Sequence, residues 1–414
     1  MVTEKIFGTA LGISSPCFIA GMSFERSQRK VNIRIDFEAG SRFAVPGQTA
    51  EHPVHYTVSK TYRHLNFFQH ECELEVRVPR VKLPNGKVVL VSPRWAGKLS
   101  GFTLWFEAFV LLLAREMIYC GAAHISGLWV HRVMAVCERY VNTAVSAADF
   151  SEVRRVPLDE TSCAKGQNYV TLFADADPDP AQRRVIFVAE GKEATTVEAF
   201  AANLRAVHGK PTQIDSVSID MSPAFMRGVT DHLPNAQITF DKFHVIAHAS
   251  EAIDKMRRLE HKREQSLKGL HWVLLKDCGK LIAAQRTELD GLLAHITTTR
   301  AARAWHYREQ LRDILTRKQP NVVHLLFNRW CSNVLRWKVE PMKEVAEMIR
   351  SHLDGVRAWV TSRQTNGFLE AINGLFHAAR RKARGYGRFR TVRMIIFLIA
   401  GQLDFSRINR YVAA

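Results

Sequence analysis

The sequence predicts a mixed α/β protein: an α/β domain is interrupted by a long helical segment and preceded by a small β-rich module and a group of helices. Three observations predict this organisation. Short alternating runs fill residues 1 to about 95, strand and helix patterns alternate over residues 151–241, and residues 243–360 are almost wholly helical in pattern. At 414 residues the chain is also too long for one compact core.

The first module is predicted from residues 31–37 (VNIRIDF) and 73–83 (ELEVRVPRVKL), in which apolar and polar residues alternate. A period of two is typical of a strand with one buried face. The stretch LPNGK, residues 83–87, contains the Asn-Gly pair of a tight turn. We therefore expect a β-rich module over residues 1–97.

Residues 98–150 change to a helical pattern. The stretch GFTLWFEAFVLLLAREM is joined through GAAHIS to GLWVHRVMAVCERYVNTA, and the last of these is basic and aromatic. Three short helices of this kind suit a helix-turn-helix whose final helix enters the major groove of DNA. A helical linker bundle explains the same periodicity equally well.

The α/β domain is predicted from runs that end in turn signals. A helix is expected over residues 195–209, and another from Ser222, which can cap it before Pro223. The expected strands are YVTLFADA (169–176), RRVIFVAEG (183–191), DSVSID (215–220) and AQITFD (236–241).

Two long amphipathic stretches, residues 287–317 and 340–360, indicate helices packed on one another. A further helix follows in residues 362–393 and leads into a strongly basic segment. No internal repeat and no low-complexity tract is visible in the chain.

The charge balance indicates a polyanionic partner. There are 58 Lys and Arg against 40 Asp and Glu, which leaves a net charge of +18 and a pI near 9.8. Nucleic acid is the partner most consistent with such an excess, because neutralised phosphates supply much of its binding energy. A merely basic, soluble enzyme is the alternative.

The compartment is predicted from cysteines and apolar runs. The seven cysteines lie far apart without a CxxC pair, which disfavours a disulfide framework and fits a reducing compartment. The first residues do not resemble a signal peptide, and the apolar runs LWFEAFVLLLA and MIIFLIAG are too short to span a bilayer. We therefore expect a cytoplasmic protein.

Three acids stand out as candidates for chemistry. Asp159 and Asp220 each end an apolar run, in VPLDET and VSIDMSP, and Glu370 lies in the helical stretch TNGFLEAIN. Carboxylates from three segments suit the hard ions Mg²⁺ and Mn²⁺. Asp220 also fits an ordinary cap or turn residue, and three loosely spaced acids among 40 can arise by chance. The apolar positions expected to pack the helix that carries Glu370 are Phe368, Leu369, Ile372, Leu375 and Phe376.

The motifs VPLDET, SIDMSPAF, ITFDKFHV and TNGFLEAINGLFHAARRKARGYGRF, in this order, resemble the transposases of the ISL-three group of bacterial insertion sequences. The resemblance extends over nearly the whole chain and includes RHLNFFQHE, RVPRVKLPNG and SGFTLWFEAFVLLLAREM. These transposases belong to the DDE class, and the resemblance implies an RNase H-like catalytic fold. It further implies cytoplasmic, nucleoid-associated activity in a bacterium.

By this resemblance Asp159, Asp220 and Glu370 are the catalytic acids and hold Mg²⁺ or Mn²⁺. Asp241 and His244, in DKFH, resemble an Asp-x-x-His signature that supports the site, and Asn373 is a further supporting residue. A plainer explanation stands beside this one, in which Asp241 caps the following helix and His244 is half-buried in it.

The resemblance also sets the expected domains. Residues 1–97 form the β-rich DNA-binding module, and residues 98–150 form the helix-turn-helix. Residues 151–245 and 361–414 form the RNase H-like catalytic domain, and residues 246–360 form an all-helical insertion within it.

One departure from the family concerns zinc in the first module. Val45, Gln48 and Leu83 stand where the family pattern has cysteines, which leaves His52 and His55 as the plausible ligands. A structural zinc site normally needs four ligands, so a structural zinc is doubtful.

The expected partner is double-stranded DNA, both the terminal inverted repeats and the target. The run at residues 378–393 has no acid and interleaves aromatic residues, so we expect it to bind phosphates; a solvated basic face is the alternative. A homodimer or larger assembly on DNA is expected, because two ends are cut and joined together. The expected DNA-binding residues are Arg380, Arg381, Lys382, Arg384, Arg388 and Arg390.

The predicted function is metal-dependent cleavage of DNA at transposon ends, followed by strand transfer. Water and then the freed 3′-hydroxyl act as nucleophiles, so no covalent protein intermediate is needed. Two alternatives are a catalytically inactive or co-opted DNA-binding protein and an RNase H-like nuclease that acts on other nucleic acids.

Overall fold

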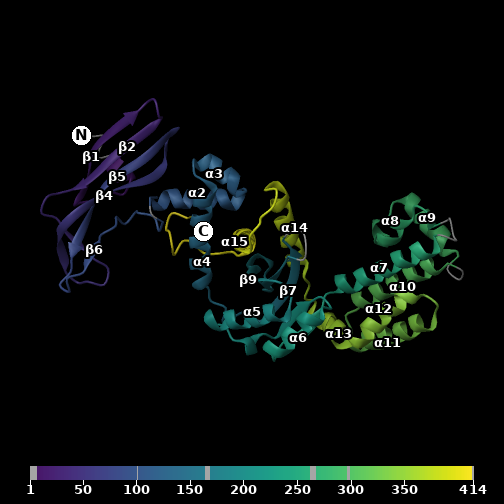
Figure 1. The fold of residues 1–414 in the computed structure, drawn as a ribbon. Coiled ribbons are helices and arrows are strands. Elements are labelled where there is room, and N and C mark those ends of the chain that lie inside the picture. Colours follow the sequence, from purple (N-terminus) through teal and green to yellow (C-terminus); the bar gives the residue numbers. More distant parts are fainter. Residues whose placement is uncertain (1–6, 100, 164–167, 262–266, 296–298, 413–414) are drawn as a thin grey trace. The chain divides into compact units, whose positions relative to one another are not determined.

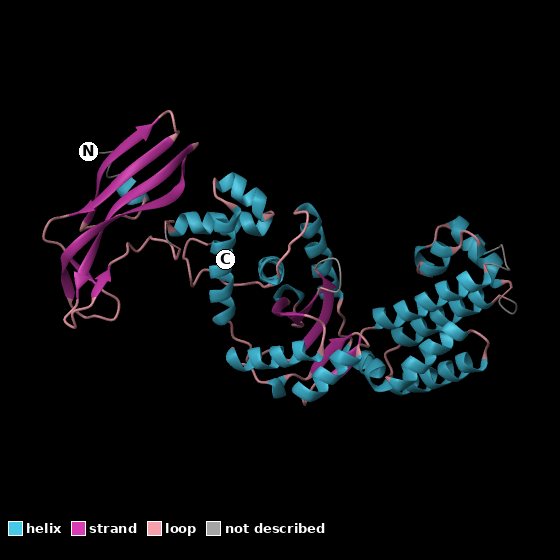
Figure 2. Cartoon of the chain, in the orientation of Figure 1, coloured by secondary structure: helices cyan, strands magenta, loops and turns pink. Residues whose placement is uncertain are grey.

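The computed structural model describes residues 7–99, 101–163, 168–261, 267–295 and 299–412 (Figure 1). The chain divides into two compact units, each with its own sheet (Figure 2). The first unit contains residues 1–147, 382–384 and 403–414, and the second contains residues 148–381 and 385–402. Mixed α/β architecture is confirmed, and the finer division into four domains stays a prediction.

The sheet of the first unit follows the order β1-β2-β5-β4-β3, with β6 paired to β5. Alternation decides which face is buried: in β2 and β5, Ile33, Ile35, Leu74 and Val76 lie in the core while their neighbours are more exposed. The strands are β1 (Cys17–Glu25), β2 (Lys30–Phe37), β3 (Arg42–Ala44), β4 (Glu51–Phe67), β5 (His70–Lys82) and β6 (Val88–Leu90).

Three helices follow, as the periodicity predicts: α2 (Leu104–Glu116), α3 (Tyr119–Ser126) and α4 (Val130–Ser146). Glu107 of α2 is fully buried, and its carboxylate accepts hydrogen bonds from the Tyr140 hydroxyl and from the Lys98 and Leu99 amides. Asn409 donates to the same hydroxyl, so the segment around Asn409 is held on this bundle.

The sheet of the second unit has the order β11-β10-β7-β8-β9. β7, β8 and β9 are antiparallel neighbours, whereas β10 is parallel to both β7 and β11. β10 (Ser216–Ile219) is buried throughout, which fits a central strand covered on both faces. The other strands are β7 (Arg155–Ser162), β8 (Tyr169–Asp175), β9 (Arg184–Glu190) and β11 (Gln237–Phe240).

Two helices connect these strands, α5 (Ala194–Ala206) and α6 (Pro223–His232), and they pack on one another. Phe200 of α5 stacks on Phe173 of β8, with ring centroids 4.5 Å apart. Ser222 occupies the N-cap position of α6 as expected, but its side chain makes no capping hydrogen bond. The Asp220 carboxylate instead accepts from the Ser222 amide, at 3.0 Å.

The region from residue 242 to residue 362 is helical, and its described residues contain no strand. The pattern of long amphipathic stretches predicted this. The helices are α7 (Lys242–Glu260), α8 (His271–Leu275), α9 (Ala283–Leu293), α10 (Arg300–Thr316), α11 (Pro320–Arg336), α12 (Glu340–Ser351) and α13 (Leu353–Ser362).

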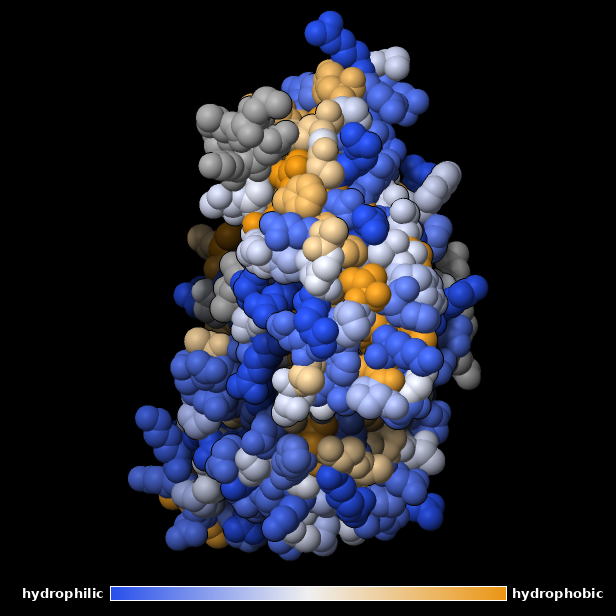
Figure 3. Space-filling view, turned by 90° about the vertical axis from the view of Figure 1, so that its left-hand side faces the viewer, coloured by the Kyte–Doolittle hydropathy of each residue, from blue (hydrophilic) through white to orange (hydrophobic). Residues whose placement is uncertain are grey.

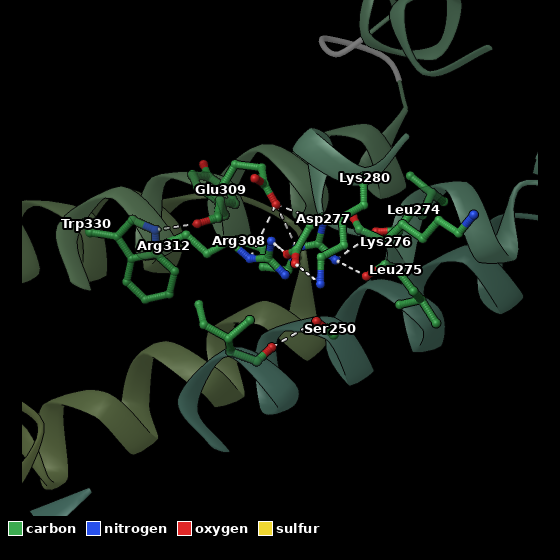
Figure 4. Close-up of polar contacts among 12 residues, drawn as sticks. Ser250, Leu274, Leu275, Lys276, Asp277, Lys280, Arg308, Glu309, Arg312 and Trp330 are labelled. Carbon is green, nitrogen blue, oxygen red and sulfur yellow. Dashed lines mark hydrogen bonds and ion pairs between the residues drawn. The ribbon is translucent and has the colours of Figure 1, made fainter. Parts of the chain in front are cut away.

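A buried arginine joins two of these helices (Figure 4). Arg308 of α10 is 0% exposed and donates to the carbonyls of Leu274, Leu275 and Lys276 at the end of α8. It also pairs with the Glu309 carboxylate at 2.8 Å. The free carbonyls of a helix end attract a cation, so the arginine caps the C-terminal end of α8 and holds it against α10.

The chain returns to the sheet region through α14 (Gly367–Lys382) and α15 (Phe389–Ala400). Leu369, Ile372 and Phe376 are buried in α14, but Leu375 is 55% exposed, so the expectation that it packs this helix is wrong. No helix among the described residues is long and apolar enough to cross a membrane. On the face drawn in Figure 3, hydrophobic residues form short patches among hydrophilic ones.

Candidate active site

Two of the predicted acids belong to neighbouring parallel strands: Asp159 lies on β7, and Asp220 directly follows Ile219, the last residue of β10. In the register of β7 and β10, Ser216 lies beside Arg155 and Ser218 beside Pro157. Continued two residues past this pair, just beyond the end of β10, the same register places Asp220 next to Asp159. The electrostatic effect of Asp220 on Asp159 agrees with that proximity.

Asp159 is held by neutral donors. Its carboxylate accepts from the Glu160 amide at 2.9 Å and from the side-chain amide of Asn373 at 2.9 Å. Burial raises the pKa of the Asp159 carboxyl to about 6; Asp220 and Glu160 add to this rise, while His244 and the Glu160 amide oppose it. A carboxylate that is costly to ionise beside another acid is typical of a functional site.

The third acid, Glu370, is exposed in the first turn of α14. Within the part of the chain that the structure describes, no three His, Cys, Asp or Glu side chains form a group able to hold one metal ion. The structure therefore brings Asp159 and Asp220 together and leaves Glu370 outside a common cluster with them.

Glu370 nevertheless belongs to the helix face that contacts β7. The other residues of this face recur at spacings of three and four, and each forms a hydrogen bond with β7. Asn366 donates to the Leu158 carbonyl and Asn373 donates to Asp159. His377 pairs with Thr161, and Arg380 donates to the Ser162 carbonyl. Side chains at such spacings share one side of a helix. By this spacing Glu370, although exposed, is expected on the same side of α14 as these contacts.

The structure shows the plainer role of Asp241 and His244, a helix cap and a half-buried side chain, and their role in supporting the site stays a prediction. Asp241 is fully buried and caps α7 through the Phe243 amide, at 2.9 Å. Its other oxygen accepts from the Asn366 amide, so it also fixes the start of α14. His244 acts electrostatically on Asp159, and its Nε2 is buried without a hydrogen-bond partner.

The remaining predicted residues lie elsewhere. Arg380 is half-buried, whereas Arg381, Lys382, Arg384, Arg388 and Arg390 are exposed. In the first module, His52 is buried on β4 with an unpartnered Nε2, and His55 is exposed.

The sequence did not single out several residues of this neighbourhood. Glu160 lies close to Asp220, since burial first and then Asp220 raise the pKa of its carboxyl. Asn366 and His377 connect α14 to β7 across more than 200 residues. Their positions at spacings of seven and four residues from Asn373 could have identified them as one helix face.

The chain is similar to known proteins over most of its length. The model of a transposase family, the DDE transposases of the ISL3 (ISL-three) group, matches residues 156–396. The transposase for insertion sequence element IS1001 of Bordetella parapertussis is 25% identical over 344 residues, which cover 80% of this chain and 82% of that protein. The transposase for element IS1557 of Mycobacterium tuberculosis is 25% identical over 421 aligned residues, 93% of each chain.

The match covers more than half of the chain and includes Asp159 and Asp220. The chain is therefore a transposase by family. Within that class it belongs to the ISL3 group of insertion-sequence transposases, and the resemblance seen in the sequence is confirmed.

Proposed function

We propose that this transposase cleaves DNA at the ends of its own insertion sequence and joins the freed strand to target DNA, with Asp159, Asp220 and Glu370 as the catalytic acids. The observation that carries the proposal is the pair Asp159, on β7, and Asp220, directly after the adjacent parallel strand β10, with α14 hydrogen-bonded alongside β7. A sheet in which three antiparallel strands continue into two parallel ones supports an RNase H-like core.

The residues fit a hard divalent cation. The two aspartates and Glu370 offer only oxygen ligands, which suit Mg²⁺ or Mn²⁺. The raised pKa of Asp159 supports this, because a cation beside the carboxyl would favour its ionised form. When bound, such ions activate the attacking oxygen and stabilise the leaving oxygen of a phosphoryl transfer.

The protein's own residues prepare the site. Asn373 and the Glu160 amide each donate to one oxygen of Asp159 and so orient the carboxylate. The Ser222 amide does the same for Asp220. Asp241 holds the start of α14, so the position of Glu370 along β7 depends on it. These contacts fix two acids on the sheet and leave the third on an exposed helix face.

DNA binding is assigned to basic and helical surfaces. Basic residues at the end of the helix that carries Glu370 and in the segment after it would hold phosphates beside the cleaved bond. They are the half-buried Arg380 and the exposed Arg381, Lys382, Arg384, Arg388 and Arg390. We further propose that α2, α3 and α4 form a helix-turn-helix that reads the terminal repeats. Cutting and joining two ends requires at least a dimer on DNA.

The test uses labelled duplexes that carry the inverted repeats flanking the gene, incubated with the protein and Mn²⁺. Nicking at the repeat ends is expected, and Asp220→Ala should bind the DNA but not nick it. Binding without nicking by the parent protein would instead identify an inactive DNA-binding protein. Cutting without regard to the repeats would identify a general nuclease.

A further inference from the structure

A cavity of about 230 Å³ opens on the second unit at the start of β7. It is lined by the beginning of β7, by the loop after β8 and by the segment between α13 and α14. Three arginines from these separate segments, Arg155, Arg183 and Arg363, face the same cavity. Nothing in the catalytic proposal uses them.

The charges in this cavity are not balanced. Asp177 is the one carboxylate in its lining, and it already accepts from the Asp179 amide. Arg183 donates to the Asp177 carbonyl at 3.1 Å, and Arg363 donates to the carbonyls of Leu315 and Arg317. All of these acceptors are neutral, so each guanidinium keeps its full charge.

Arg155 is the least constrained of the three. It is exposed, and its guanidinium makes no hydrogen bond or ion pair with any residue that the structure describes. Three neighbouring guanidiniums repel one another, and an anion with several oxygens relieves that repulsion.

Gln364 adds a second observation. Its side chain lines the cavity, is 7% exposed, and accepts a hydrogen bond from the Ser216 hydroxyl. Its amide nitrogen is buried without a partner. Unpaired buried donors are rare, and an oxygen-rich ligand in the cavity would offer the kind of acceptor that this donor lacks.

The cavity lies on the same side of β7 as the catalytic acid. Arg155 and Pro157 line it, and side chains at alternate positions of a strand share a face, so Asp159 points to that face too. Four residues of a strand extend over about 13 Å. Successive phosphates of one DNA strand advance by about 3.4 Å along a duplex, so this separation corresponds to roughly four nucleotides.

We propose that this cavity binds a backbone phosphate of the DNA strand that passes the paired aspartates, and that it fixes the register of that strand in the site. The inference rests on the proposed function, since it takes the strand to lie across Asp159. The ligand chemistry is a phosphate, either a phosphodiester of bound DNA or a free nucleotide.

The experiment measures binding of end DNA without divalent metal, so that its outcome does not depend on cleavage. Arg155→Gln and Arg183→Gln are compared with Arg227→Gln, an exposed arginine of α6 whose ion pair is with Asp231. Neutral methylphosphonates are placed one at a time along the strand. Thermal unfolding checks that each variant is folded.

The parent protein should lose affinity when a phosphate about four nucleotides from the scissile bond is neutralised. Arg155→Gln should weaken binding about fivefold, lower the salt slope by about 0.9, and abolish the effect of that one methylphosphonate. Arg183→Gln should act at the same position, and Arg227→Gln should behave as the parent.

Titration with adenosine monophosphate distinguishes the two sources of phosphate. Three results together would identify a free nucleotide as the ligand: the parent binds adenosine monophosphate, Arg155→Gln abolishes that binding, and Arg155→Gln leaves the DNA affinity unchanged. The phosphate site would then stand with a free nucleotide as its ligand. If Arg155→Gln and Arg183→Gln match the parent in both assays, the inference is wrong. If the protein shows these binding results but does not nick end DNA, only the catalytic proposal is refuted.

Discussion

Two charged side chains of the second unit, Arg308 and Asp159, are removed from water in opposite ways. Arg308 is fully buried, and three carbonyls and the Glu309 carboxylate surround its guanidinium. Asp159 receives only two neutral donors and has a second acid, Asp220, beside it. The first charge is compensated and holds two helices together. The charge of Asp159 is offset in part by the electrostatic effect of His244, but no described residue pairs with it as Glu309 pairs with Arg308. Such a partly compensated acid is typical of a functional site.

The largest expected effect concerns which glutamate completes the partly compensated site. Glu370→Gln should reduce nicking of end DNA by about a thousandfold or more, because one ligand of the metal ions is lost. Glu160→Gln should reduce it much less, although Glu160 also lies close to Asp220. Single-turnover nicking rates with saturating Mn²⁺ measure both.

The Glu160 variant is the matched control, since it removes a carboxylate of the same size from the same neighbourhood. Equal DNA affinity of the two variants would show that both still bind substrate. If Glu160→Gln is the inactive one, the third acid comes from β7 and the role assigned to α14 is refuted.

Arg308, whose charge is compensated inside the protein, should affect stability and not catalysis. Arg308→Met should lower the free energy of unfolding by about 3–5 kcal/mol, because Glu309 and the end of α8 lose their partner inside the protein. Urea unfolding followed by circular dichroism measures the loss. Arg258→Met, at a 72% exposed side chain of α7, should cost less than about 1 kcal/mol. Equal losses of unfolding free energy from the two variants would mean that the buried Arg308 contributes no more to stability than an exposed arginine.

The pH dependence of stability tests whether the Asp159 carboxyl is costly to ionise in the folded protein. The pKa of Asp159 is raised to about 6 in the folded protein, from an ordinary value near 3.8, so the folded state binds the proton more tightly. The stabilisation from the protonated carboxyl is complete below about pH 4 and is lost as the pH rises through 6. Asp159→Asn should therefore raise the unfolding free energy at pH 7.5 by about 1–2 kcal/mol.

Adding Mg²⁺ makes this test specific for metal binding at Asp159. A cation bound beside Asp159 favours the ionised carboxyl, so in the parent protein the loss of stability between pH 4 and 6 should shrink when Mg²⁺ is added. Asp159→Asn should show little pH dependence in that window and little response to Mg²⁺. A parent protein whose pH profile ignores Mg²⁺ would count against metal binding at this carboxyl.

Local patterns predicted much of this molecule. The alternation at residues 31–37 and the amphipathic stretches at 287–317 and 340–360 predicted strands and helices, because burial on one face imposes a period. Asp220 was predicted as an acid at a strand end, since an apolar run and a turn bracket it. These features depend on residues close together in the chain.

Local patterns could not predict features that depend on distant pairing, and only the family resemblance indicated that Asp159 and Asp220 belong to one site. The neighbourhood of Asp159 and Asp220 follows from the register of β7 against β10, and Asp241 bonds to Asn366 across 125 residues. The full burial of Arg308 requires α8 and α10 to meet. Periodicity contains no information on which strand or helix end a side chain will meet. The exposed position of Glu370 likewise depends on how α14 lies on β7.

The smallest expected effect concerns the amide that orients Asp159. Asn373→Ala removes a donor to the ionised carboxylate, so the pKa of Asp159 should rise further and the pH at which nicking reaches half its maximum should move upward. The maximal rate should fall only about tenfold, because the carboxylate itself remains. Asn328→Ala, at an exposed asparagine of α11 bonded to His324, is the control. A lower rate with an unchanged pH profile would mean that Asn373 only packs α14 on β7, and that donors elsewhere set the ionisation of Asp159.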